Sequence, residues 1–272
     1  MSQINNPLEI YKLLPKSNCR QCLAPTCLAF AAEVIKGQKQ LGNCPHLDKN
    51  IIEQLNGKIV RQTNFEQHLE KTLTDLKNKI KTVDFPSSAE RLGAKLSNDK
   101  LTIKCLGKNF TVDTGGNITS DCHVNVWVTI PLLNYIISSA GTNVSGKWVP
   151  FRELKNGMKF NPLFEQRCEK PLKQIADAHT ELFEDMIYIF GGKQVTTGFP
   201  FNISIVLYPL PGVPILLCYS KPEDDLESRL NIFFDATAED NLNVESIYML
   251  FGGLVLMLQK ITSRHGVRPL TY

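Results

Sequence analysis

The sequence predicts an α+β protein, with a small, mostly helical domain followed by a mixed α+β domain that holds an antiparallel sheet. The first observation behind this prediction is a group of four cysteines within 26 residues near the N-terminus. The second is that helix-like and strand-like patterns follow one another irregularly after about residue 96, without the regular βαβ order of a parallel sheet. We expect three parts: a four-cysteine domain at 1–50, a helical connector at 51–95 and the mixed α+β domain at 96–272.

The composition is typical of a soluble globular protein. Hydrophobic residues make up 43% of the 272 residues and charged residues 21%. The formal net charge of +3, without a dense Lys/Arg block, gives no support for a nucleic-acid partner. The longest apolar run, Ile247–Leu258, has 12 residues, whereas a membrane span needs roughly 20. We therefore expect a buried helix there and no membrane partner.

The cysteines are expected to carry free thiols. The N-terminal stretch "MSQINNPLEIYK" lacks the basic-then-apolar layout of a signal peptide, so we expect a cytoplasmic protein. In a reducing cytoplasm the eight cysteines of the chain would not be paired as disulfides. Cys105 and Cys218 lie in apolar, strand-like runs, where a free cysteine behaves as a small hydrophobic core residue.

An apolar stripe predicts one long helix in the connector, after a short helix at 7–14. Its members recur at intervals of three and four: Phe65, Leu69, Leu73, Leu76 and Ile80. Asn64 suits the N-cap position. The Pro/Ser-rich stretch 84–93 then predicts a break in the chain.

The patterns after residue 96 predict an irregular mixture of elements. Two strand-like runs in 100–113 predict a hairpin around Gly107–Asn109. Pro131 suits the first turn of a helix that Gly141 would end, and the stretches 146–154 and 157–160 look extended or irregular. The remaining elements are expected as helices at 161–179 and 180–192, strands at 201–210, 213–220 and 229–235, and an apolar helix at 244–263.

The spacing of the four cysteines points to a metal centre. The cluster follows the pattern C-x2-C-x4-C-x16-C and consists of Cys19, Cys22, Cys27 and Cys44, with Pro45 directly after it. Four thiolates are the ligand set of a [4Fe–4S] cube and equally of a structural zinc site. Zinc sites of this kind usually show two well-separated C-x2-4-C pairs. Three bunched cysteines and a remote Cys-Pro are typical of iron–sulfur sites, so the spacing favours a cube, and zinc or unligated core thiols stay open as alternatives.

A predicted helix supports a negatively charged site at Cys27. The stretch 25–37 has Thr26 as a candidate N-cap, an Ala-rich body and Gly37 as a stop. Cys27 would then lie in the first turn, where backbone N–H groups and the positive end of the helix dipole stabilise a thiolate.

The stretch "NCRQCLAPTCLAFAAEVIKGQ…NCPHL" resembles the small four-cysteine iron–sulfur domain at the N-terminus of the large subunit of corrinoid iron–sulfur proteins. The resemblance covers about 50 residues and rests on the spacing, the "PTCLAFA" helix start and the "CP" ending. In that family the four cysteines bind one [4Fe–4S] cluster. The resemblance therefore implies that the metal ligands here are Cys19, Cys22, Cys27 and Cys44.

A second resemblance covers roughly 170 residues and rests on "LLNYIISSAGTNVSGKWVPFREL", "PLPGVPILLCYS" and "NIFFDATAEDNL". These stretches resemble a domain of unknown function, the DUF3786 group, found mainly in anaerobes, for which no catalytic residues transfer. Together the two resemblances imply a low-potential redox protein that moves single electrons through one [4Fe–4S] cluster in anaerobic one-carbon metabolism. The sharper form places a corrinoid (cobalamin) in the C-terminal domain. The expected partner is a redox protein, including a corrinoid protein or a methyltransferase.

Outside the cysteine cluster, three residues are candidates for binding a cofactor. His123, beside Cys122, could coordinate the cobalt of a corrinoid, and Trp148 with Arg152 could wall a flat ligand. With Glu153 the last two also suggest an alternative, an iron–sulfur enzyme with a site in this stretch. The structural explanation for Arg152 is pairing with a buried carboxylate.

A third alternative is a structural or assembly module in which the cluster is a folding staple. Asp235, at the end of a predicted strand, suits a helix N-cap or a turn as well as a site. The chain lacks the G-x-S-x-G, P-loop, dinucleotide-binding and H-E-x-x-H motifs. The hydrolase, nucleotide-binding and zincin classes therefore get no support.

Overall fold

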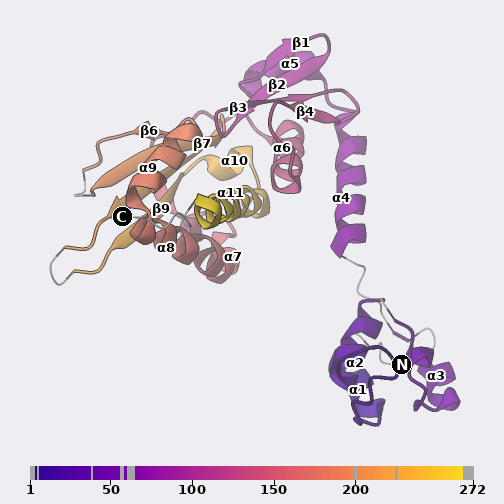
Figure 1. Cartoon of the computed structure of the whole chain (residues 1–272). Helices are drawn as coiled ribbons and strands as arrows, with labels where there is room; N and C mark the ends of the chain where they lie inside the picture. The colour runs from indigo at the N-terminus through magenta and orange to yellow at the C-terminus, as the bar shows by residue number, and fades with distance from the viewer. Residues whose placement is uncertain are drawn as a thin grey trace. The chain divides into compact units, whose positions relative to one another are not determined.

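The computed structural model describes residues 4, 6–37, 39–55, 58–59, 65–198, 201–223 and 226–265. The chain divides into two compact units, Met1–Thr74 and Asp75–Tyr272. The first is helical and the second contains two antiparallel sheets with helices (Figure 1). The predicted α+β class is therefore confirmed.

The N-terminal unit is built from short helices around one apolar core. Its elements are α1 (Pro7–Leu13), α2 (Cys27–Ile35), the 3₁₀ turn η1 (Leu41–Asn43) and α3 (Lys49–Leu55). α1 confirms the predicted short helix, since Pro7 occupies its first turn and the Asn6 side chain accepts a hydrogen bond from the Leu8 N–H. Ile10 of α1 and Phe30 of α2 are fully buried in the same core. Burial of these side chains joins the two helices.

α4 (Phe65–Ile80) confirms the helix predicted from the apolar stripe. Leu76 and Ile80, in its last turns, are buried. Lys77 donates from Nζ to Oδ1 of Asn117 at 3.0 Å, which fixes this end of the helix to the second unit. Asn64, the predicted N-cap, lies outside the described residues.

Another helix, α5 (Phe85–Arg91), occupies the stretch in which a Pro/Ser-rich break is predicted, so that prediction is wrong. Pro86 falls in the first turn, where a missing backbone N–H leaves no intrahelical bond unmade. Phe85 and Leu92 are buried at the two ends of the segment. Composition suggested a break because the same residues that end helices also begin them.

α6 (Val126–Ser138) starts earlier than predicted, so Pro131 lies inside the helix and not in its first turn. An internal proline removes one backbone hydrogen bond. Extensive burial offsets this loss, since Val128, Leu132 and Ile136 are each at most 3% exposed. Packing against the rest of the unit thus overrides the local signal of the proline.

The first sheet is a four-stranded antiparallel meander. Its strands are β1 (Lys95–Ser97), β2 (Lys100–Cys105), β3 (Lys108–Val112) and β4 (Ile118–Ser120). The predicted hairpin is confirmed as β2–β3, but its turn lies at Leu106–Gly107, one position earlier than predicted. Both turn residues have positive φ, 48° and 75°, as a two-residue hairpin loop of type I′ requires.

The second sheet has five antiparallel strands in the order β5-β9-β8-β7-β6. The strands are β5 (Trp148–Pro150), β6 (Lys193–Gln194), β7 (Ile203–Leu210), β8 (Val213–Ser220) and β9 (Arg229–Asp235). β7, β8 and β9 confirm the three predicted strands, including the end at Asp235. Nearly every residue of β7 and β8 is buried, which explains their continuous apolar sequence.

The helices of the second unit surround its core. They include a 3₁₀ turn η2 (Phe151–Glu153), α7 (Gly157–Phe164), a π-helical turn η3 (Glu165–Glu169), α8 (Lys170–Ala178), α9 (Thr180–Ile189), α10 (Ala238–Asn241) and α11 (Val244–His265). The stretch 157–160 is helical, so the prediction of an irregular segment there is wrong. A side chain at Gly157 would overlap the Phe151 carbonyl, so glycine is required for this close approach.

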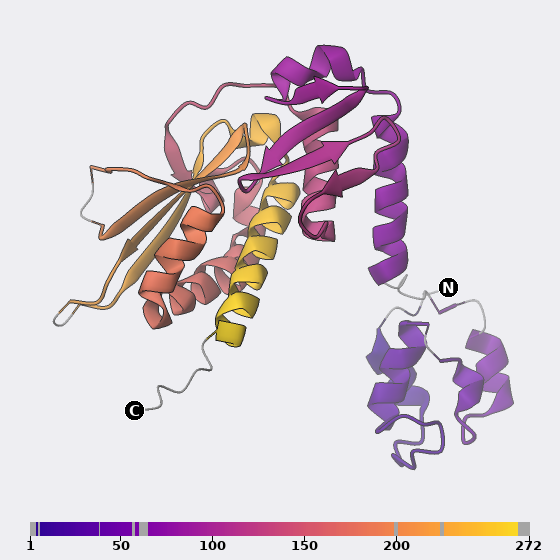
Figure 2. The same ribbon diagram turned by 45° about the horizontal axis from the view of Figure 1, so that its top comes forward.

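α11 is the central helix of the core and confirms the predicted apolar helix. It lies between α6 on one side and α7 and α8 on the other (Figures 1 and 2). Phe251 joins three other buried aromatic rings, and Phe151 and Phe164 of that group stack with centroids 4.1 Å apart. Among the described helices α11 alone is long and apolar enough to cross a membrane, but half of that stretch is buried inside the unit. Its apolar sequence is thus accounted for by the core.

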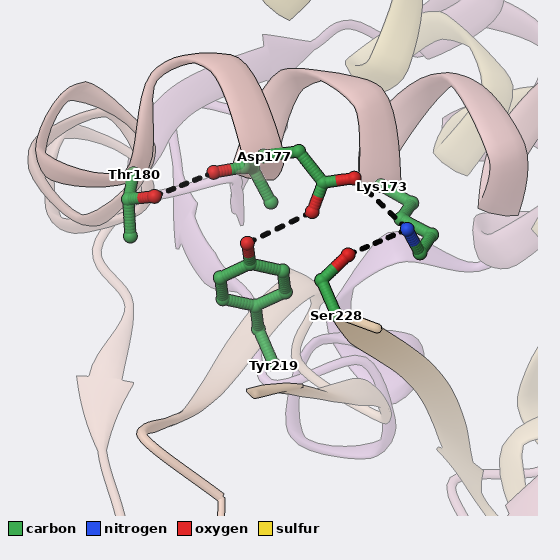
Figure 3. A network of polar contacts seen from close by, with 6 residues as sticks. Lys173, Asp177, Thr180, Tyr219 and Ser228 are labelled. Atoms are coloured by element: carbon green, nitrogen blue, oxygen red, sulfur yellow. Dashed lines mark hydrogen bonds and ion pairs between the residues drawn. The ribbon is translucent and has the colours of Figure 1, made fainter. Parts of the chain in front are cut away.

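A polar network connects α8 to the ends of β8 and β9 (Figure 3). Lys173 donates from Nζ to Asp177 at 2.9 Å and to Oγ of Ser228 at 2.6 Å. The hydroxyl of Tyr219 donates to the other oxygen of Asp177 at 2.8 Å. Burial and the Asp177 carboxylate raise the pKa of Tyr219 to about 12, so its phenol stays protonated at neutral pH.

Asp235 fixes the segment that leads into β5. It is completely buried and accepts hydrogen bonds from the N–H groups of Ser145, Gly146 and Thr237 at 2.7–3.1 Å. The hydroxyls of Ser145 and Thr237 donate to it as well. Burial raises the pKa of Asp235, but these hydrogen bonds lower it more, so the net pKa lies below the ordinary value.

We expect Asp235→Asn to lower the free energy of unfolding at pH 7 by about 2–4 kcal/mol, because an amide NH2 would face N–H donors. A depressed folded-state pKa gives stability that is present above the unfolded value of about 3.9 and is lost as the pH falls through the folded value. The difference between wild type and variant should therefore shrink below about pH 4. Urea unfolding followed by tryptophan fluorescence measures it, since both tryptophans, Trp127 and Trp148, lie in the second unit.

The control for this prediction is Asp99→Asn, in the exposed turn between β1 and β2 with φ of 55°. Asparagine suits a left-handed turn as well as aspartate does, so this change should be within about 0.5 kcal/mol of wild type. An equal loss of stability in both variants would contradict a special role for Asp235.

Candidate metal centre

The predicted start of α2 at Cys27 is confirmed. Thr26 has extended backbone angles, and its side chain accepts from the Ala29 N–H at 3.0 Å, as an N-cap does. The helix ends before Gly37, whose φ is 74°. Cys27 is the first helical residue and is only 7% exposed. A thiolate there is stabilised by the positive end of the helix dipole and by nearby N–H groups.

Asn18 links the loop of the first cysteines to Cys27 through two hydrogen bonds. Its backbone N–H donates to the Cys27 sulfur at 3.4 Å, and its Oδ1 accepts from the Cys27 N–H at 2.8 Å. An N–H that points at a ligand sulfur stabilises negative charge on it. Sequence reasoning missed this residue. The available signal was an asparagine directly before Cys19, since asparagine tolerates the left-handed conformation found here.

The loop that carries Cys19 and Cys22 has an unusual backbone. Four of its residues have positive φ without being glycine: Lys16, Asn18, Arg20 and Leu23, at 51–62°. Left-handed residues next to residues of ordinary φ form concave "nests" of backbone N–H groups that bind anions, including iron–sulfur clusters. This backbone therefore suits a negatively charged cluster.

Lys39 fixes the position of Cys22. Its ammonium donates to the Cys22 carbonyl at 2.8 Å and pairs with the Glu33 carboxylate of α2 at 2.8 Å. The Leu23 N–H donates to the Arg20 carbonyl at 2.9 Å, which closes a turn around the cysteine. No sequence pattern announced the role of Lys39, because it is far from Cys22 along the chain.

Cys44 approaches from a separate segment. It directly follows η1 and donates from its N–H to the Leu41 carbonyl at 3.1 Å. The Asn43 side chain in turn accepts from the Gln40 N–H at 2.7 Å, which stabilises the 3₁₀ turn. Cys44 is 6% exposed. The remote fourth cysteine is thereby held at the same apolar core as Cys22 and Cys27.

The four thiols differ in burial. Cys27 and Cys44 belong to the apolar core of the unit, Cys22 packs against it and Cys19 is exposed. Throughout the described part of the chain, no three His, Cys, Asp or Glu side chains converge closely enough to hold one metal ion. Four thiolates are the ligand set of a [4Fe–4S] cube, in which each thiolate binds a different iron, so the chemistry of this donor set suits a cube.

The other candidate residues lie on separate elements. His123 is exposed before α6, and its carbonyl accepts from the Asn125 side chain at 3.4 Å. Trp148 lies on β5 and packs on the sheet against Val206 and Leu216. Among the described residues, no hydrogen bond or ion pair joins His123 to either Trp148 or Arg152.

Arg152 and Glu153 lie in η2 and are exposed. Burial and nearby Glu165 raise the pKa of Glu169, and Arg152 partly opposes this rise. The structural explanation, a half-buried carboxylate partner for Arg152, thus has a definite candidate in Glu169.

The second unit holds one further polar arrangement that sequence reasoning missed, the network of Figure 3. Ser228 with Lys173 invites comparison with a Ser–Lys nucleophile pair. The Lys173 ammonium donates to both Asp177 and Ser228, so it cannot accept a proton from the serine in this arrangement. An open cavity of about 910 Å³ adjoins Ser228 at the strand ends, and its described lining includes neither His123 nor Trp148.

Two family models match the chain. Residues 14–46 match a model described as "Putative Fe-S cluster", and residues 84–257 match one described as "Domain of unknown function (DUF3786)". The first match contains all four cysteines of the centre. The N-terminal unit therefore carries an iron–sulfur domain, and both predicted resemblances are confirmed.

Curated relatives match through a short N-terminal segment. The acetyl-CoA decarbonylase/synthase complex subunit gamma 1 of Methanosarcina thermophila is 49% identical over 47 residues, which are 17% of this chain and 10% of that protein. The corrinoid/iron-sulfur protein large subunit of Moorella thermoacetica is 50% identical over 48 residues, 18% of this chain and 11% of that protein. The chain thus spans about a tenth of the length of these relatives.

No solved structure matches the chain. The second match, over 84–257, covers more than half of the 272 residues. The chain therefore belongs to the family described as domain of unknown function DUF3786, with an iron–sulfur domain at its N-terminal side.

Proposed function

We propose that this protein is a low-potential, cytoplasmic redox protein of anaerobic one-carbon metabolism. Its metal ligands are Cys19, Cys22, Cys27 and Cys44, and the [4Fe–4S] cluster that they would hold supplies one-electron transfer. The partner that gives or takes the electron is a second redox protein. In the finer form of the proposal that partner is a corrinoid protein or a methyltransferase.

One observation carries the proposal: a four-cysteine segment with iron–sulfur spacing in which the Asn18 N–H already points at the Cys27 sulfur. The chain's own groups supply the rest of the environment. The N-terminus of α2 and the left-handed loop direct backbone N–H groups toward negative charge. Phe30 and Leu41 exclude water from the core beside the buried cysteines.

Metal analysis of protein purified without oxygen tests the proposal. We expect about four irons and four acid-labile sulfides per chain, a broad visible absorbance that bleaches on reduction, and an electron paramagnetic resonance signal in the reduced form. Stoichiometric zinc without sulfide would exclude the cube. A cluster that no low-potential reductant reduces would favour the alternative of a structural module.

We propose further that a corrinoid accepts the electron, bound by the C-terminal domain of this chain or by the partner. The names of two relatives contain a corrinoid/iron-sulfur protein and an acetyl-CoA decarbonylase/synthase complex, which supports a corrinoid acceptor. The residues proposed to bind it here are His123 before α6, Trp148 on β5 and Arg152 in η2. Equilibrium dialysis with hydroxocobalamin distinguishes the two placements. Tight binding that His123→Ala abolishes would support a corrinoid on this chain, and no stoichiometric binding would support one on the partner.

Substituting Asn18 should shift the reduction potential of the cluster. In Asn18→Ala the left-handed φ of 51° disfavours alanine, so the N–H donation to the Cys27 sulfur weakens and the potential falls on the order of tens of millivolts. Asn18→Gly loses the same side chain but accepts the left-handed backbone, so its potential should stay closer to wild type. Redox titration followed by electron paramagnetic resonance measures both. Equal shifts in the two variants would assign the effect to the side chain alone.

A further inference from the structure

We propose that the loop of Cys19 and Cys22 is the docking surface for an acidic electron-transfer protein, with Leu23 at its centre. This inference rests on the proposed function and adds to it the face and the charge of the partner. It is carried by an exposed apolar side chain, exposed basic residues in and next to the same loop, and a backbone that fixes the loop.

Leu23 is the most exposed large hydrophobic residue described in the chain, at 89% exposure, directly after a cluster cysteine. Leu28, directly after Cys27, is 44% exposed. Neighbouring apolar residues of the same segment, Ala24 and Phe30, are buried as expected. Leucine at these two exposed positions adds nothing to the core, whereas a partner that covers them would gain apolar burial beside the metal ligands.

The backbone presents Leu23 in a fixed position. Its φ of 57° is left-handed, a conformation that is unfavourable for a residue with a side chain. The turn is nevertheless held by the Leu23 N–H bond to Arg20 and by the Lys39 bond to the Cys22 carbonyl. A strained residue that the surroundings hold in place is a feature of functional surfaces.

The charged residues of the loop itself are all basic, and Glu33, the acidic residue linked to it, is paired with Lys39 at 2.8 Å. From Ile10 to Ala32 the chain contains Lys12, Lys16 and Arg20, all exposed, and no Asp or Glu. Lys16 and Arg20 are themselves left-handed residues of the loop. A basic rim around an apolar centre complements a partner with an acidic rim, and such steering raises association rates roughly 10- to 1,000-fold at low ionic strength.

This pattern suits a brief encounter between redox proteins. Electron transfer moves one electron from the reduced donor to the oxidised cluster, and no bond forms or breaks. Weak redox complexes bury less than about 1,200 Å², so a small apolar spot with charged surroundings is sufficient. Leu23 directly follows Cys22, and Cys19 in the same loop is exposed, so a partner docked on this loop comes close to the ligands.

Stopped-flow reduction of the full-length, cluster-loaded protein by flavodoxin hydroquinone tests the inference, because flavodoxin is an acidic one-electron donor. We expect Lys16→Glu with Arg20→Glu to lower the second-order rate constant about tenfold or more at low salt and to remove its decrease with salt. Leu23→Ser should lower the rate constant several-fold with the salt dependence unchanged. A basic cytochrome c, reduced by the cluster, should react faster with the charge-reversed variant than with wild type.

Matched controls separate docking from general effects. Lys95→Glu with Lys104→Glu changes the net charge equally on exposed strand positions, and Met158→Ser removes an apolar side chain that is 67% exposed. Both controls should react as wild type does. Each variant must first show wild-type iron content and full reduction by dithionite, which tests the cluster independently of docking. If the charge reversal disturbs the structure of the loop, Lys16→Gln with Arg20→Gln replaces it. This variant should lower the second-order rate constant by a smaller factor.

The inference is overturned if the charge-reversed variants and Leu23→Ser reduce at the wild-type rate, or if the control variants slow equally. Loss of dithionite-reducible cluster in the wild type would instead remove the proposed function itself.

Discussion

Cys27→Ala is expected to abolish the iron–sulfur cluster. Cys27 is buried at the start of α2, and its sulfur accepts a hydrogen bond from the Asn18 N–H, so alanine removes one of the four proposed ligands. Iron should fall from about four per chain to well below one after anaerobic purification, and the visible absorbance should disappear. Iron and sulfide analysis measures the change.

The matched control is Cys122→Ala. Cys122 is exposed in the second unit, and its sulfur lies 3.2 Å from the Ser120 hydroxyl. Its iron content should equal that of wild type. An unchanged cluster in Cys27→Ala, or an equal loss in both variants, would contradict the ligand assignment.

The second large effect concerns two adjacent glycines of α11. Alanine should change the free energy of unfolding in opposite directions at these two positions. A methyl group on Gly253 would overlap the ring of Trp127 in α6, whereas one on Gly252 would meet only the Cys168 sulfur at 3.7 Å, an ordinary contact. Alanine gains about 1 kcal/mol over glycine within a helix. We expect Gly252→Ala to raise the free energy of unfolding by up to about 1 kcal/mol, and Gly253→Ala to lower it by about 1–3 kcal/mol through overpacking.

Urea unfolding followed by tryptophan fluorescence compares the two variants. The slope of the unfolding free energy against urea concentration should be the same in both, so that a shifted midpoint reports a change in stability. Trp127→Leu combined with Gly253→Ala should recover part of the loss, because the smaller side chain makes room at the α6–α11 contact. A shift in the same direction for both glycine variants would mean that the contact with Trp127 is not the reason for glycine at position 253.

The sequence predicted those features that depend on local pattern. The start of α2 at Cys27 followed from Thr26 and an Ala-rich body, and the helix that ends at Ile80 followed from its apolar stripe. The spacing of the cysteines led to an iron–sulfur domain, which the family match confirms.

Features that depend on distant contacts could not be predicted in this way. Pro131 looked like a helix start because the packing of α6 on α11 is invisible in the sequence. Lys39 is remote from Cys22 along the chain, so its bond to that carbonyl had no sequence signal. Trp148 and Arg152 are near in the chain, but their surroundings come from distant segments: Trp148 packs on the sheet against Val206 and Leu216, and Arg152 partly opposes the rise in the pKa of Glu169.

The π-helical turn η3 marks where the second unit can lose a residue. It joins α7 and α8 into one continuous helical segment, and a π turn accommodates a residue more than an α-helical turn does. Deleting one residue from Glu165–Glu169 would restore regular α-helical geometry and leave α8 in nearly the same phase relative to α7. Lys173 and Asp177 would then still face Ser228 and Tyr219. A deletion within α7 or α8 themselves would instead rotate everything that follows by about 100°, so chains of this fold should tolerate single-residue deletions at η3 better than in the helices on either side.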